Sequence, residues 1–240
     1  FWYLDDQRRR TLFKQGRPGT GENWAEKIAA ELAGLLGIPH AHYDLAEWKG
    51  MQGVISPSLV SKGGRLIHGN ELIEGKVTVA SDDEKVRYYE QRSHIASRAF
   101  QFFEVNADLI LPPPGYEPIE GVHSALGVFI GYLLFDAWIA NQDRHSQNWG
   151  VVSSAAKLYL SASYDHGSSL GRNETDARRK AILTTKDKGA SMAAYVAKAR
   201  SAFYPHAAGN AKVKAHLTYD LFRIAYEADP KAGRAWLSRL

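Results

Sequence analysis

The feature that most constrains the fold is an uninterrupted apolar run over residues 125–135, which Asp136 ends. A membrane-spanning helix needs about 20 apolar residues, so this run is too short to cross a bilayer and we expect no membrane association. It predicts a helix over 122–140 that is buried inside a lobe. A chain of 240 residues can form one domain, or two small lobes around a cleft.

The composition excludes several kinds of site. The sequence contains no Cys, which rules out disulfides, thiolate catalysis and Cys-ligated metals and is consistent with a cytoplasmic protein. The formal net charge of +4 is modest, and no run of Lys and Arg forms a tail for nucleic acid. We therefore expect contact with nucleic acid only through a partner.

Strand patterns dominate before the buried helix and helical patterns after it. We expect strands at 1–4, 10–14, 40–46, 53–55 and 64–68, helices at 22–36 and 83–103, a hairpin at 151–160, and helices at 186–204 and 214–240. This order predicts an α+β, two-lobed fold. The sheet-rich N-terminal lobe spans 1–75, and the larger helical lobe spans 76–240.

Two residues near the N-terminus form a pair in sequence order. Lys14 ends an apolar strand, and Glu26 lies on the helix that follows it. Glu26 shares a helix face with the small residues Ala30 and Ala33, whereas the opposite stripe is apolar: Trp24, Ile28, Leu32 and Leu35. Because small residues let a sheet approach closely, we expect Glu26 to reach across to the strand that carries Lys14.

A polar segment, Asn141-Gln142-Asp143-Arg144-His145-Ser146-Gln147-Asn148, follows the buried helix directly. Asp143 and Asn148 stand five positions apart, which is the Asp–Asn separation of a kinase catalytic loop, and Asp165 follows the hairpin. Phosphoryl transfer needs a carboxylate that orients the attacking hydroxyl, oxygen ligands for Mg²⁺, and a Lys on the phosphates. The chain offers a residue for each role in the kinase order, which predicts an ATP- and Mg²⁺-dependent phosphotransferase.

The same residues resemble a known family. The loop Asn141-Gln142-Asp143-Arg144-His145-x-x-Asn148, with Tyr164-Asp165-His166-Gly167-Ser168-Ser169, is similar to the HipA-like serine/threonine kinases, which include bacterial toxin kinases of toxin–antitoxin systems. The similarity extends to Leu12-Phe13-Lys14 and to Glu22-Asn23-Trp24-Ala25-Glu26. It implies a two-lobed protein-kinase-like fold, a protein substrate and, for a toxin, an antitoxin protein as partner.

The resemblance also implies roles for individual residues. Asp143 would be the catalytic base, Asn148 and Asp165 would hold Mg²⁺, and Lys14, braced by Glu26, would contact the phosphates of ATP. The segment Glu71-Leu72-Ile73 would be the hinge whose backbone meets adenine, and Tyr164, Arg144 and His145 would line the nucleotide site. For Arg144 and His145 taken alone, we favour a structural role in bracing the loop.

Two points leave the function open. No Gly-rich phosphate loop precedes Lys14, so that loop lies upstream of Phe1 or phosphate is bound in another way. Small-molecule and lipid kinases of kinase-like fold use a similar Asp/Asn/Asp set, so the acceptor is not determined by these residues. The alternatives are a small-molecule or lipid kinase, and a catalytically silent nucleotide-binding module.

Overall fold

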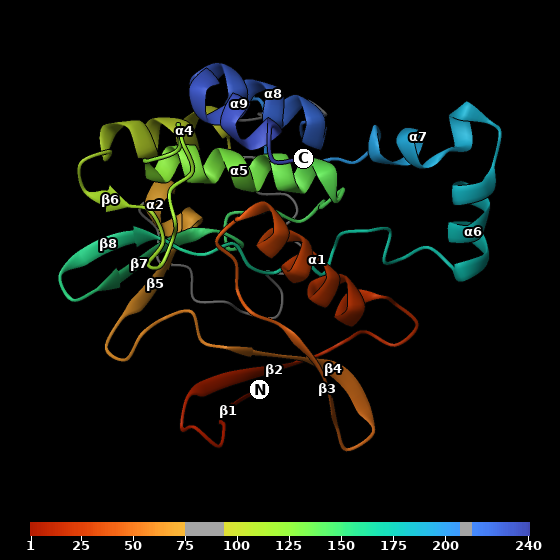
Figure 1. Cartoon of the computed structure of the whole chain (residues 1–240), viewed down its shortest axis with the longest axis horizontal. Coiled ribbons are helices and arrows are strands. Elements are labelled where there is room, and N and C mark those ends of the chain that lie inside the picture. The colour runs from red at the N-terminus through yellow and green to blue at the C-terminus, as the bar shows by residue number, and fades with distance from the viewer. Residues whose placement is uncertain (75–93, 207–212) are drawn as a thin grey trace.

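The computed structural model describes residues 1–74, 94–206 and 213–240 (Figure 1). Its first layer is a four-stranded antiparallel sheet with the order β1-β2-β4-β3. The strands are β1 (Trp2–Leu4), β2 (Arg10–Gln15), β3 (Asp44–Trp48) and β4 (Met51–Pro57). The first two strands lie where they are predicted and pair as an antiparallel hairpin. Strand β3 begins later than predicted, because residues 41–43 follow the irregular path of an isolated bridge between His40 and Ser163.

Helix α1 (Glu22–Leu36) has the predicted bounds, and Gly37 ends it in the left-handed conformation with φ of 76°. The helix buries its small-residue face, including Ala25, Ala29 and Ala33, and contacts β3 and β4. Ile28 and Leu35 of the apolar stripe are exposed. The close approach of a helix to a sheet therefore decides which face is buried here.

A second sheet joins distant parts of the chain, in the order β5-β7-β8-β6. Its strands are β5 (Arg65–His68), β6 (Ile110–Leu111), β7 (Gly150–Ser154) and β8 (Lys157–Leu160). The predicted hairpin at 151–160 corresponds to β7 and β8, and β5 pairs with β7. Because β5 belongs to this sheet, the chain leaves the first layer between β4 and β5, earlier than the boundary at residue 75 that the sequence predicts.

Helices pack on the far side of the second sheet (Figure 1). They are α2 (Gly69–Glu74), α4 (Ala96–Val105), α5 (Ala125–Trp138), α8 (Thr218–Ala228) and α9 (Pro230–Leu237). The predicted buried helix is α5, which begins at its cap Ser124 and is buried over almost its whole length. The helix expected at 83–103 lies partly outside the described residues, and α4 covers its end. The described helices are all too short or too polar to cross a membrane.

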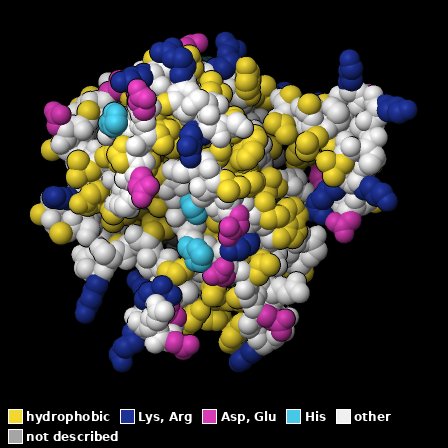
Figure 2. Space-filling view, viewed as in Figure 1, with side chains coloured by type: hydrophobic (Ala, Val, Ile, Leu, Met, Phe, Trp, Pro, Cys, Tyr) yellow, Lys and Arg dark blue, Asp and Glu magenta, His cyan; other side chains and the backbone are white. Residues whose placement is uncertain are grey.

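Residues 176–196 form an arm that projects from the body, made of α6 (Asp176–Thr184), a 3₁₀ turn (Lys188–Ala190) and α7 (Met192–Val196) (Figure 1). The prediction of a single helix at 186–204 is wrong. Asp187 and Ser191 each cap a new short element, which interrupts a continuous helix. Figure 2 shows Lys and Arg side chains on the outer edge of the arm and apolar ones where it meets the body.

The observed architecture confirms the predicted α+β class, with strands concentrated in the N-terminal region and helices in the C-terminal region.

Candidate active site

Lys14, Glu26 and Asp165 meet at the junction of the two layers. Nζ of Lys14 lies 2.8 Å from Oε1 of Glu26 and 2.5 Å from Oδ1 of Asp165. The other oxygen of Glu26 accepts a hydrogen bond from the backbone N–H of His166 at 2.8 Å. Glu26 therefore joins the strand that carries Lys14 to the segment that carries Asp165, as the order of these residues in the sequence predicts.

The charged groups of this cluster shift one another's pKa values. Burial alone would lower the pKa of Lys14, but the carboxylates of Asp165 and Glu26 raise it above its usual value. Burial would raise the pKa of Asp165, and the ion pair with Lys14 outweighs it and lowers the pKa to about 2. Glu26 is fully buried, and burial raises its pKa to about 7 despite the nearby ammonium. Lys14 and Asp165 are thus charged at neutral pH.

The catalytic-loop candidates Asp143 and Asn148 are tied to each other. Nδ2 of Asn148 donates to the backbone carbonyl of Asp143 at 2.7 Å, which leaves the amide oxygen of Asn148 as the atom able to bind a cation. Oδ2 of Asp143 accepts from the hydroxyl of Ser168 at 3.2 Å. Oδ1 of Asp143 is buried and has no hydrogen-bond partner among the described residues. This oxygen can therefore accept a proton from an incoming group.

The environment of Asp143 raises the pKa of its carboxyl group towards neutral pH. Burial, and then the negative charge of Asp165, raise the pKa of Asp143 to about 6. The hydrogen bond from Ser168 and the charge of Arg172 act in the opposite direction. A carboxylate with a pKa just below the working pH suits a general base, because it is ionised at rest and still accepts a proton readily.

Arg144 braces the loop that carries Asp143 and Asn148, as expected. Its guanidinium is fully buried and donates from Nε and Nη2 to the two oxygens of Asp136, each at 2.7 Å. Nη1 donates to the backbone carbonyl of Asn148 at 3.0 Å, and Asn141 donates its amide to Asp136 as well. The end of α5 therefore positions both Asp143 and Asn148 through one ion pair.

A glycine is required where the Asp165 segment passes α1. A Cβ atom on Gly167 would lie 3.0 Å from Cγ of Glu22 and 3.1 Å from Oε1 of Glu26. Such distances are shorter than ordinary carbon contacts. Asp165 itself adopts a left-handed backbone conformation with φ of 58°, which is uncommon for a residue with a side chain and recurs at functional sites.

A cavity of about 740 Å³ opens between the two layers, and we call it the cleft cavity. Five of the predicted site residues line it: Lys14, His145, Asn148, Tyr164 and Asp165. Tyr164 is fixed by its hydroxyl, which donates to the backbone carbonyl of Gln147 at 2.6 Å. Burial lowers the pKa of His145 to about 4, so its ring is neutral at pH 7. The structure therefore gathers five of the ten residues predicted to bind nucleotide or metal around one space.

The predicted hinge does not face the cleft cavity. Glu71, Leu72 and Ile73 lie in α2, where Glu71 pairs with Arg65, and Leu72 and Ile73 line a separate hollow of about 360 Å³. The cavity is lined instead by the chain that leaves β4, residues 56–60. Residues 71–73 therefore lie outside the lining of the cleft cavity, because the strand before them pairs with β7 and not with the first sheet.

Sequence reasoning missed three contributors. Ser168 belongs to the motif that contains Asp165 but was given no role, and its bond to Asp143 depends on a distant segment folding back. The buried Tyr43 accepts a hydrogen bond at its hydroxyl oxygen from the backbone N–H of Asp165 at 3.2 Å. Arg172, whose Nη1 lies 3.2 Å from Oε1 of Glu22, carries no motif. The close spacing of Ser168 to Asp165 was the available signal for Ser168, whereas Tyr43 and Arg172 had none.

The donor set suits a divalent ion shared with a bound phosphate. No group of three or more His, Cys, Asp and Glu residues that could hold a metal occurs in the described part of the chain. Asp165 and Asn148 nevertheless present one carboxylate and one amide oxygen to the cleft cavity. Mg²⁺ commonly takes one or two carboxylates from the protein and completes its shell with water and substrate phosphates. The residues present therefore fit Mg²⁺ bound together with a nucleotide.

A solved structure shares the fold over nearly the whole chain. The Helicobacter pylori proinflammatory kinase CtkA is similar with a TM-score of 0.62 at 14% identity, over 99% of this chain and 88% of that one. The chain has a protein-kinase-like fold. HipA of Shewanella oneidensis MR-1, solved with HipB and operator DNA, matches with a TM-score of 0.42 at 10% identity, over 100% of this chain and 56% of that one. No family model and no curated protein matches the sequence.

Proposed function

We propose that this chain is an ATP- and Mg²⁺-dependent phosphotransferase in which Asp143 is the catalytic base. The observation that carries the proposal is the convergence of Lys14, Asn148 and Asp165 on the cleft cavity, with Asp143 joined to Asn148. The kinase-like fold, shared over nearly the full length with CtkA, supports it. The cavity volume of about 740 Å³ lies in the range of cavities that bind small molecules and cofactors.

Each residue contributes a separate part of the reaction. Lys14 supplies a positive charge for the phosphates, and the ion pair with Glu26 holds its ammonium group near the end of β2. Mg²⁺ held by Asn148 and Asp165 would neutralise the charge of the transferring phosphoryl group. Leu59 and Leu66 give the cavity an apolar part suited to adenine. These roles position and neutralise groups, which is most of what phosphoryl transfer requires.

Asp143 acts on the acceptor. Its free Oδ1 takes the proton of the acceptor hydroxyl as the acceptor oxygen bonds to the γ-phosphorus and the bond to ADP breaks. Ser168 and Asn148 fix the carboxylate for this step. With a pKa near 6, most Asp143 side chains are ionised at neutral pH and ready to accept.

Within this class, we favour a serine/threonine protein kinase of the HipA-like toxin type that works in the cytoplasm. The catalytic-loop and Asp165 motifs support this choice, together with the absence of Cys. An antitoxin protein is the partner to test for, and any contact with nucleic acid would go through that partner.

Transfer of radiolabel from γ-labelled ATP tests the proposal. The protein is incubated with Mg²⁺ and either a bacterial protein extract or a pool of metabolites, as wild type, Asp143→Ala and the control Asp6→Asn, which changes an exposed carboxylate in the β1–β2 turn. We expect wild type and Asp6→Asn to label proteins, and Asp143→Ala to lose labelling. Equal labelling by Asp143→Ala would refute the role of Asp143. Label found only in metabolites would assign a small-molecule kinase.

A further inference from the structure

The catalytic loop borders a second cavity, which shares none of its lining residues with the cleft cavity. This arm cavity, of about 270 Å³, lies between the loop and the arm, and Gln142 lines it. Its neighbour along the chain is Asp143, while His145 and Asn148 line the cleft cavity. The backbone N–H of Gln142 donates to the carbonyl of Ser168, the residue whose hydroxyl holds Asp143. Along the chain, Asp143 thus lies between Gln142, which lines the arm cavity, and His145 and Asn148, which line the cleft cavity.

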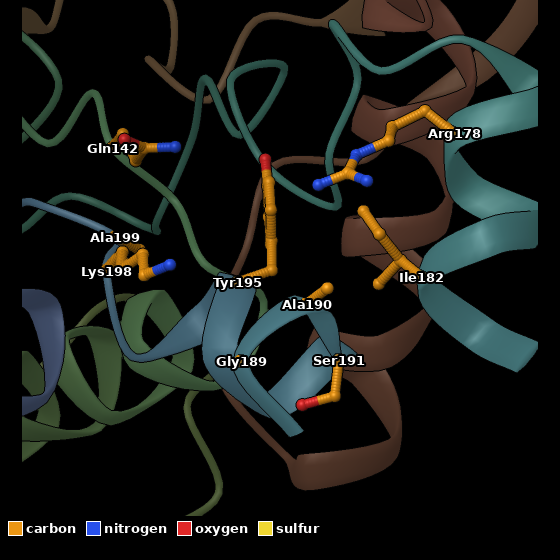
Figure 3. A pocket seen from close by; sticks show the side chains of 9 residues that line it. All are labelled: Gln142, Arg178, Ile182, Gly189, Ala190, Ser191, Tyr195, Lys198 and Ala199. Atoms are coloured by element: carbon orange, nitrogen blue, oxygen red, sulfur yellow. The ribbon is translucent and has the colours of Figure 1, made fainter. Parts of the chain in front are cut away.

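The arm cavity is positively charged. Nine residues line it, of which Arg178 and Lys198 are cations and none is a carboxylate (Figure 3). In Figure 3 the guanidinium of Arg178, the ammonium of Lys198 and the amide of Gln142 all point toward the space around Tyr195. A negatively charged group that entered there would meet donors from three directions.

Both cations are available for a ligand. Neither Arg178 nor Lys198 has an ion pair with any residue that the structure describes. Their neighbours differ in this respect, because Arg172 pairs with Glu22, and Arg179 pairs with Asp176 at 2.5 Å. The cavity therefore keeps two positive charges that have no ionic partner within residues 1–74, 94–206 and 213–240, next to the loop that would receive the acceptor.

The wall that carries these cations is well defined. Ser191 caps α7 by accepting from the N–H of Ala194 at 3.3 Å, and its hydroxyl donates to the carbonyl of Lys188 at 2.8 Å. Ile182 of α6 is buried and lines the cavity as well. The arm thus holds Arg178 and the chain that leads to Lys198 on opposite sides of one hollow.

We propose that the arm cavity binds an acidic side chain of the acceptor protein, close to the hydroxyl that is phosphorylated, and that Arg178 and Lys198 determine this preference. The inference rests on the proposed function and names its substrate class. A carboxylate complements the charge of the cavity and fits within its volume of about 270 Å³. Nucleic acid fits less well, because its recognition uses a row of cations along a backbone, whereas this cavity offers two.

A set of serine peptides tests the inference. Each peptide has Asp or Glu at one position beside the serine, and its matched partner has Asn or Gln there. Wild type, Arg178→Glu, Lys198→Glu and the control Lys180→Glu are compared, where Lys180 is an exposed cation of α6 outside the cavity lining. Steady-state transfer gives kcat and KM, and fluorescence anisotropy of labelled peptides gives affinity without any transfer.

We expect wild type and Lys180→Glu to prefer acidic peptides. Arg178→Glu and Lys198→Glu should each raise KM and Kd for those peptides about five- to tenfold, since an exposed charge pair is lost and a repulsion replaces it. The values for the neutral peptides and the KM for ATP should stay close to wild type. A merely structural role of the arm would instead lower kcat for every peptide alike.

Three results would overturn the inference. The first is equal affinity of wild type for acidic and neutral peptides, and the second is an equal effect of Lys180→Glu and Arg178→Glu. The third is binding of a single-stranded RNA that depends on Arg178 and displaces the acidic peptide. If acidic peptides bind through Arg178 but no acceptor is ever labelled, the proposed function fails and the binding preference stands.

Discussion

Replacement of Arg144 by Met tests whether one buried ion pair supports the catalytic loop. The guanidinium uses three donors, two on Asp136 and one on the carbonyl of Asn148, and neither charged side chain is accessible to water. The variant removes all three bonds. The carboxylate of Asp136 then stays buried with only the amide of Asn141 as its partner.

The expected cost follows from that unpaired charge. Loss of one member of a buried pair costs about 3–5 kcal/mol, because the other charge stays desolvated. In a chain of this size each kcal/mol lowers Tm by roughly 2–4 °C, so we expect a decrease of about 6–20 °C. Removal of both charges, in Arg144→Met with Asp136→Leu, should recover most of the stability, since no buried charge remains.

Urea unfolding and thermal melts provide the assay, together with phosphate transfer. The control is Arg223→Met, which breaks an exposed ion pair with Asp220 on α8 and should cost about 1 kcal/mol or less. We expect the double variant of Arg144 and Asp136 to fold but to transfer phosphate poorly, because nothing then holds the carbonyl of Asn148. A cost below about 1 kcal/mol for Arg144→Met would refute the reasoning.

Three further predictions concern the site itself. Below pH 6 the kcat/KM for the acceptor should fall about tenfold per pH unit, because Asp143 becomes protonated. In Ser168→Ala this fall should begin at a higher pH, since the lost hydrogen bond favoured the ionised form of Asp143. Glu26→Gln should raise the KM for ATP about tenfold, because Lys14 loses a charged partner, while circular dichroism shows an intact fold. Gly167→Ala should cost about 1–3 kcal/mol in thermal melts, since its Cβ would lie 3.1 Å from Oε1 of Glu26; an unchanged Tm would contradict that close approach.

Local signals predicted the parts of the fold that local interactions determine. The bounds of α1 follow from helical residues and from Gly37, which needs no neighbour to end the helix. The loop from Asp143 to Asn148 is determined locally, since the side chain of Asn148 donates to the backbone carbonyl of Asp143. The pair of Lys14 and Glu26 was predicted from their order and from the small residues beside Glu26, and the ion pair confirms it.

The errors concern contacts between distant segments. The sequence around Leu72 does not reveal that the preceding strand pairs with β7, which places residues 71–73 away from the cleft cavity. Asp187 and Ser191 cap separate short elements and so divide the arm. The helical composition of this segment does not show where such breaks fall.

Calorimetric titration with ATP, with and without Mg²⁺, tests the central claim most directly, because it asks whether Lys14, Asn148 and Asp165 form one nucleotide and metal site. We predict that wild type binds ATP more tightly with Mg²⁺, that Asp165→Asn loses most of this gain, and that the surface control Asp6→Asn keeps it. Equal affinity with and without Mg²⁺ in the wild type, or an undiminished gain in Asp165→Asn, would contradict the account.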